Sequence, residues 1–98
     1  MSSGVQRTMY GQFLASGALQ SILTVGFKPR IVRLYNQTSG IQLEWQESFP
    51  DATGKKTAAN GAVTFAAVNG ITQLEKGFSL GTDSINTAAQ IIHYSATE

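Results

Sequence analysis

The chain contains no cysteine among its 98 residues, only two prolines and a single histidine. The absence of cysteine excludes disulfide bonds, thiolate metal sites and cysteine nucleophiles. One histidine cannot form a histidine cluster, and the apolar neighbours Ile92 and Tyr94 favour a packed or half-exposed strand position for His93. We therefore expect neither a metal ion nor a cofactor.

Charge is also scarce, at 13% of the residues against about 25% in a typical soluble domain. No acidic residue occurs in residues 1–40, and all six carboxylate side chains follow them. Two interpretations remain open. The few charges lie on solvated faces, or Lys28, Arg30 and Arg33 form a basic face that docks on an acidic neighbour, such as the next copy of the chain. Three basic residues without a recognition motif are too small a footprint for nucleic acid, which is not expected as a partner.

Long hydrophobic runs are missing as well. The apolar stretches are only a few residues long, too short for a signal peptide or a membrane span. We expect a soluble product made in the cytoplasm, with no membrane partner. The length allows one domain, and the hydrophobic share of 42% is that of a folded protein.

Ten glycines divide the chain into short segments rich in β-branched and aromatic residues, a pattern typical of short strands joined by tight turns. The clearest strand is 41–46, where Ile41, Leu43 and Trp45 alternate with polar residues. It should form a hairpin with 30–35. Further strands are expected at 9–15, 18–25, 62–68, 71–74, 78–80 and 90–96. The predicted core consists of Val32, Leu34, Ile41, Leu43, Trp45, Val63 and Phe65. The chain is predicted to be all-β, a small antiparallel β-sandwich or jelly-roll-like barrel with an extended N-terminal arm.

The arm comprises residues 1–11, and residues 12–98 form the β domain. Apolar residues are isolated in this polar segment, so the arm is either frayed or laid across a neighbouring subunit. The candidate intersubunit contacts are Val5, Met9, Tyr10 and Phe13. Residues 48–61 are expected to be an exposed loop, which serves either binding or connection.

No arrangement of residues predicts catalysis. Glu44 and Glu47 are close in sequence, but Glu44 belongs to the wet face of a strand and Glu47 lies near its end. The segment 81–86 lacks the repeated acids of a calcium loop, so Asp83 and Asn86 are expected to bond backbone amides in a turn. The protein is not expected to be an enzyme.

Two segments resemble elements of small virion proteins of tailed bacteriophages. Residues 25–36, VGFKPRIVRLYN, resemble their "GF-x-P-x-x-V" strand entry. Residues 77–86, GFSLGTDSIN, resemble their "GF-x-[IL]-G-x-D-x-x-[IV]-N" element. Segments 43–45 and 70–72 lie between them in the same order, so the resemblance covers about residues 12–96.

The resemblance implies a structural component of the phage particle. It resembles head decoration (cement) proteins, which implies a homo-oligomer, commonly a trimer, bound to the major capsid protein on the outer capsid surface. The alternative is a module of the tail, baseplate or fibre that attaches to the host surface, by glycans or another receptor. That alternative requires exposed aromatic residues on a loop or concave face.

Overall fold

The computed structural model describes residues 7–98, in which eight strands form one antiparallel sheet and no helix occurs. The order across the sheet is β1-β8-β3-β4-β5-β6-β7-β2, so the first two strands of the chain are its two edges. The strands are β1 (Thr8–Leu14), β2 (Gln20–Ile22), β3 (Ile31–Asn36), β4 (Gln42–Gln46), β5 (Thr53–Thr57), β6 (Val63–Leu74), β7 (Gly77–Leu80) and β8 (Ile91–Thr97). The all-β, antiparallel fold expected from the sequence is confirmed.

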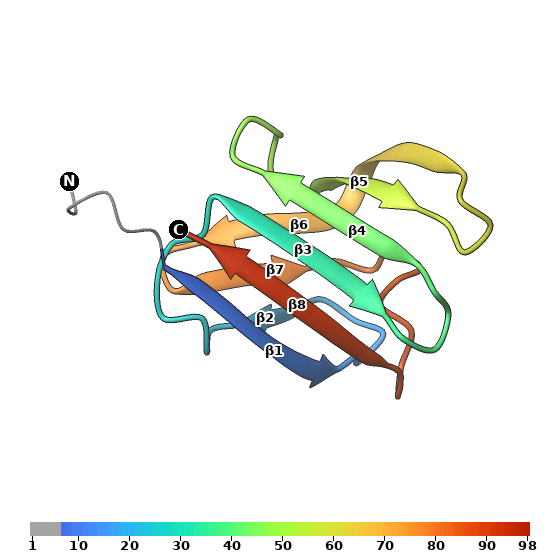
Figure 1. The fold of residues 1–98 in the computed structure, drawn as a ribbon, viewed down its shortest axis with the longest axis horizontal. Helices are drawn as coiled ribbons and strands as arrows, with labels where there is room; N and C mark the ends of the chain where they lie inside the picture. Colours follow the sequence, from blue (N-terminus) through green and yellow to red (C-terminus); the bar gives the residue numbers. More distant parts are fainter. Residues whose placement is uncertain (1–6) are drawn as a thin grey trace.

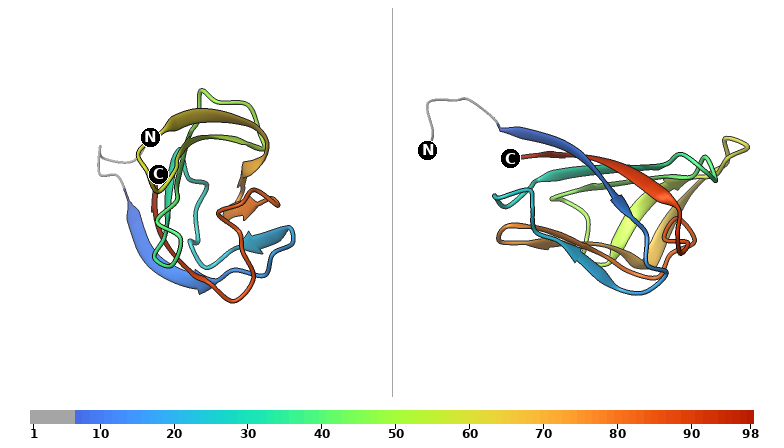
Figure 2. Two further views of the ribbon diagram at one scale, coloured as in Figure 1. Left: turned by 90° about the vertical axis from the view of Figure 1, so that its right-hand side faces the viewer. Right: turned by 90° about the horizontal axis from the view of Figure 1, so that it is seen from below.

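The sheet is curled into a half-barrel. Strands β1, β8, β3 and β4 form one layer, and β6, β7 and β2 lie behind it (Figure 1). The end-on view in Figure 2 shows the curl, which brings the two edges of the sheet toward each other. Phe13 of β1 thereby packs against Phe78 of β7, with 6.3 Å between the ring centroids. The interior is thus closed by aromatic contacts between strands that share no hydrogen bonds.

The core follows from alternation along the strands, because successive side chains point to opposite faces of a sheet. Val32 and Leu34 on β3 and Leu43 and Trp45 on β4 are buried as predicted. The indole N–H of Trp45 donates a hydrogen bond to the carbonyl oxygen of Pro50 at 3.1 Å. The remaining buried apolar side chains are Ala15, Ile22, Val25, Phe27, Ile71, Phe78, Leu80, Ile85, Ile92, Tyr94 and Ala96.

The two predicted Gly-Phe elements both bring a phenylalanine into this core, since Phe27 and Phe78 are buried. Gly26 has φ of 84°, a conformation that a side chain disfavours. Gly77 is required for another reason. A Cβ atom at this position would lie 1.9 Å from the carbonyl oxygen of Ile22, where β7 and β2 run side by side.

Three expectations from the sequence are wrong. The segment 48–61 is not all loop, because it contains β5. Segments 62–68 and 71–74 are one strand, β6, whose pairing with β5 shifts register between Thr53 and Gly54. Val63 and Phe65 are not core residues, at 56% and 53% exposed. They pair with Thr57 and Lys55 of β5, whose side chains lie on the outer face of the sheet, so Val63 and Phe65 point away from the core.

Two other boundaries differ from those expected. Of the strand expected at 18–25, only the three residues of β2 form a strand. Ile41, expected within a strand and in the core, lies just before β4 and is half-buried against the core. Residues 8–11 of the predicted arm belong to β1, which pairs with β8 along its whole length.

Candidate functional site

The outer face of the sheet is a regular surface formed by six of the eight strands. The side chains that point away from the core line up in two neighbouring rows that run across six strands, because directly paired residues share a face. The first row is Tyr10, Ser95, Arg33, Glu44, Lys55 and Phe65. The second row is Gln12, His93, Tyr35, Gln42, Thr57 and Val63. Each row is polar in its middle strands, and the first has an aromatic residue at both ends.

A shallow groove of about 270 Å³ lies on this face, over β1, β8, β3 and β4. Tyr10 and Tyr35 contribute aromatic side chains to it, at 76% and 44% exposed. Its polar side chains are Arg33, Gln42, His93 and Ser95.

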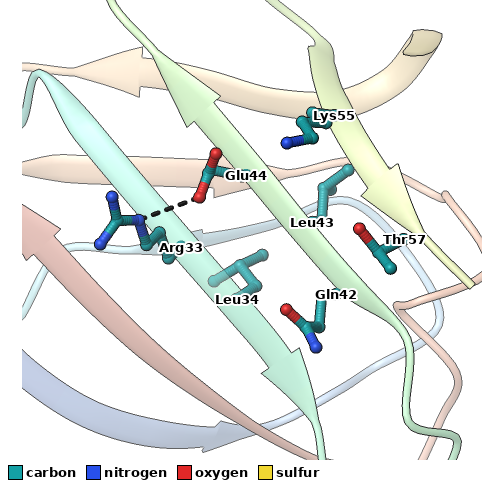
Figure 3. Close-up of a pocket in the computed structure, with 7 residues that line it drawn as sticks. All are labelled: Arg33, Leu34, Gln42, Leu43, Glu44, Lys55 and Thr57. Carbon is teal, nitrogen blue, oxygen red and sulfur yellow. Dashed lines mark hydrogen bonds and ion pairs between the residues drawn. The ribbon is translucent and has the colours of Figure 1, made fainter. Parts of the chain in front are cut away.

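A second hollow, of about 130 Å³, continues the groove toward β5, and Arg33 and Gln42 line both. Figure 3 shows this second hollow, with Glu44, Lys55 and Thr57 around it.

Two exposed ion pairs join β3 and β4 or the residues next to them. The Nε of Arg33 donates to Oε2 of Glu44 at 3.0 Å across the two strands, on the outer face (Figure 3). Arg30, just before β3, lies 3.9 Å from Glu47, just after β4, and neither residue lines the groove or the second hollow. Both pairs are solvent-exposed, so each contributes about 0–1 kcal/mol to stability. Their effect is to position the side chains rather than to stabilise the fold.

The candidate docking charges are therefore not gathered in one unpaired basic face. Arg30 and Arg33 each have a carboxylate partner within their own chain. Lys28 is exposed in the connection between β2 and β3. Sequence spacing alone could not show these pairings, because both carboxylates belong to residues beyond the hairpin turn.

The candidate intersubunit contacts have different positions. Val5 lies outside the described residues. Met9 and Tyr10 are exposed on β1. Phe13 instead faces the interior of its own chain, where it packs against Phe78 and Tyr94 with centroid distances of 6.3 and 6.2 Å. Leu14, which the sequence did not single out, is 61% exposed at the end of the same strand.

The outward edge of β1 has no strand partner among residues 7–98. The backbone N–H of Glu98 donates to the carbonyl of Arg7, and the backbone N–H of Ala15 donates to the carbonyl of Gln90. In an antiparallel pair every second residue bonds to the neighbouring strand, so the odd-numbered residues from 7 to 15 are those that bond to β8. The N–H and C=O groups of Thr8, Tyr10 and Gln12 consequently point away from the sheet. No charged side chain and no proline occurs between residues 8 and 14, so the edge lacks the usual protection against pairing with another strand.

Side chains join the start of β1 to the end of β8 beside this edge. The guanidinium of Arg7 donates two hydrogen bonds to the Glu98 carboxylate, at 2.9 and 2.6 Å. These bonds lower the pKa of the Glu98 carboxyl and raise that of Arg7. Arg7 also lies over the ring of Phe27, 4.9 Å from its centroid. The start of β1 is thus held to the end of β8 by side chains as well as by backbone.

The turn predicted at 81–86 is present, and it has a larger role than its sequence indicates. Oδ2 of Asp83 accepts a hydrogen bond from the backbone N–H of Ile85 at 3.2 Å, as expected. The side chain of Asn86 bonds to the backbone of other segments. Its Oδ1 accepts a hydrogen bond from the N–H of Gly17, and its Nδ2 donates to the carbonyl oxygens of Ala18 and Gly81. Asp83 also forms a partly buried ion pair with Lys56 at 3.2 Å. These residues connect loops, and residues 7–98 contain no group of three potential metal ligands.

Comparison of the chain with protein-family models, with curated proteins and with solved structures found no match in any of the three. Within the described part of the chain, no helix has the length and hydrophobicity needed to cross a membrane.

Proposed function

We propose that the protein is a structural component of a bacteriophage particle, a decoration protein that binds the major capsid protein on the outer surface of the capsid. In this role it associates with its own copies and reinforces the shell. The observation that carries the proposal is the free, uncharged edge of β1. The two sequence elements that resemble phage virion proteins support the same role.

The edge of β1 is suited to pairing with a second chain. Its outward N–H and C=O groups are preformed partners for another strand. Exposed Tyr10 and Leu14 add apolar area, and burying each such side chain contributes about 1.5–3 kcal/mol before the costs of association. Repeated over many copies in a shell, contacts of this size are sufficient for stable attachment.

Two modes of association use this edge. Antiparallel pairing of β1 with β1 of a second copy gives a two-fold dimer. If the two-fold axis passes through Gly11, Tyr10 of one copy lies opposite Gln12 of the other, and all seven residues of the strand are paired. Head-to-tail pairing of β1 with the β2 edge of the next copy gives a ring where the rotation between copies closes, and an open filament where it does not. The trimer that we propose for the capsid surface corresponds to the second mode.

The test uses a proline that blocks the edge without breaking the sheet. Gln12 directs its N–H outward, so Gln12→Pro removes an edge donor and no bond to β8. Gln12→Ala is the matched control, because it makes the same loss of side chain but keeps the donor. Phage lacking the protein are complemented with each variant, and copies per particle are counted by quantitative mass spectrometry and electron microscopy.

We expect hundreds of copies over the head with the wild type and Gln12→Ala, and at least a tenfold reduction, on the order of 1.4 kcal/mol, with Gln12→Pro. Particles decorated equally by both variants would contradict pairing through β1. A few copies located only at the tail would contradict the decoration role itself.

The alternative is a tail, baseplate or fibre module that attaches to the host surface. The exposed aromatic side chains of Tyr10 and Tyr35 on the outer face favour it, since attachment modules need such residues. The same particle images distinguish the two roles by the number and place of the copies.

A further inference from the structure

We propose that the groove on the outer face is a binding site for a short oligosaccharide, formed by Tyr10, Tyr35, Arg33, Gln42 and Ser95. This inference is separate from the association through β1 and from the location of the protein on the particle. The groove uses side chains of the sheet face, whereas the association uses mainly the backbone of the sheet edge, and Tyr10 is the one residue that both include.

The two tyrosines provide the apolar part of the site. Strands lie about 4.8 Å apart and rise about 3.4 Å per residue, and Tyr10 on β1 and Tyr35 on β3 are two strands and two residues apart, so their backbone positions are separated by about 12 Å. That spacing allows two rings of one oligosaccharide to contact two aromatic side chains. Tyrosine combines a flat apolar ring with a polar hydroxyl, and it has few rotatable bonds to immobilise on binding.

The polar part of the site offers both donors and acceptors, as the hydroxyl groups of a sugar require. Gln42 supplies an amide N–H and a carbonyl oxygen, and Ser95 supplies a hydroxyl. Arg33 uses its Nε for Glu44, and no other hydrogen bond of its guanidinium is found among the described residues. The ion pair therefore fixes Arg33 while leaving its terminal nitrogens for a ligand.

The shape of the groove favours a saccharide over an apolar small molecule. It is shallow and open, and its walls alternate between aromatic and polar groups. An apolar ligand would find no enclosed pocket here, whereas a sugar keeps its outer hydroxyl groups in water. All of the proposed contacts come from strands β1, β8, β3 and β4, which hold them in place before binding.

The site is tested with the purified full chain and labelled chitohexaose, cellohexaose and hexagalacturonate. Binding is followed by nuclear magnetic resonance shifts of the backbone amides. We expect at least one of these probes to bind with a dissociation constant on the order of 1 mM or below. The shifts should be confined to the outer-face residues of β1, β8, β3 and β4.

Tyr35→Ala should weaken that binding about tenfold, and Tyr35→Phe, which keeps the ring, should weaken it less. Leu19→Ala is the control, since Leu19 is also an exposed apolar side chain, at 70% against 44% for Tyr35, but lies outside the groove. Absence of shifts with all three probes would overturn the proposal. A second result would also overturn it: Tyr35→Ala loses attachment to capsids while the wild type binds no saccharide. That result would assign the groove to a protein partner. Gln12→Pro separates the two proposals, because it should abolish self-association and leave saccharide binding unchanged.

Discussion

Replacement of Asn36 by alanine removes a buried polar side chain that hydrogen-bonds to two separate loops. Asn36 is fully buried at the end of β3. Its Nδ2 donates to the carbonyl of Ile85 at 2.9 Å and to Oε1 of Gln90 at 2.8 Å. Its Oδ1 accepts from the backbone N–H groups of Thr38 and Ser39 at 2.9 and 3.0 Å. One side chain thus joins the β3–β4 turn to the loop before β8.

The expected cost of Asn36→Ala is about 3–5 kcal/mol. Each of the four hydrogen bonds contributes about 0.5–1 kcal/mol net, which is about 2–4 kcal/mol together, and a buried partner left without a bond costs about 1 kcal/mol more. The carbonyl of buried Ile85 is such a partner. For a domain of this size, a loss of 3 kcal/mol lowers the melting temperature by roughly 12–24 °C.

Urea denaturation followed by circular dichroism measures this loss, at one fixed protein concentration because self-association adds to apparent stability. Gln37→Ala is the control, since Gln37 is exposed and its bond is to the His93 side chain; we expect a change within about 0.5 kcal/mol. A loss below about 1 kcal/mol for Asn36→Ala would refute the reasoning that this network holds the two loops together.

Three further changes test other parts of the structure. Trp45→Ala should cost about 3–5 kcal/mol in urea denaturation, because the side chain is fully buried, and a near-neutral effect would exclude a core position. Gly77→Ala should destabilise the fold more than Gly26→Ala in the same assay. The new Cβ at position 77 would collide with the carbonyl oxygen of Ile22, whereas the new Cβ at position 26 would only strain the backbone φ angle, which costs about 1 kcal/mol. The reverse order would contradict the β2–β7 contact. The lowered pKa of Glu98 means that its bond to Arg7 supports the folded state above the ordinary carboxyl pKa and is lost as pH falls through the lowered value. A carbonyl chemical-shift titration of Glu98 should therefore have its midpoint below the ordinary value, and Arg7→Gln should raise it; equal midpoints would mean that the bond is absent in solution.

Alternation was sufficient to predict the strands whose inner and outer faces differ in polarity. Ile31–Asn36 and Gln42–Gln46 were found within one or two residues of their boundaries, together with the hairpin between them. β5 was missed because its residues, TGKKT, have no apolar face. It is a strand because β4 and β6 pair with both of its edges. The exposure of Phe65 has the same origin, since it depends on the pairing of β6 with β5 and not on local residue type.

The candidate groove could be predicted only in part. Alternation along β3 places Arg33 and Tyr35 on the wet face, opposite Val32 and Leu34. Their approach to Tyr10 and His93 depends on β8 lying between β1 and β3, a pairing of residues more than fifty positions apart. No local pattern contains that information. The burial of Asn36 was equally hidden, because the partners of its Nδ2, Ile85 and Gln90, lie in a loop distant in sequence.

Amide hydrogen exchange along β1 tests the central claim, that this edge pairs with another copy of the chain. The N–H groups of Met9, Gly11 and Phe13 bond to β8, so they should exchange slowly in the monomer and in the assembly. Those of Tyr10 and Gln12 point outward, so they should exchange rapidly in dilute monomer and become protected when the protein associates or binds capsids. Rapid exchange at Tyr10 and Gln12 in the fully assembled state would contradict the account.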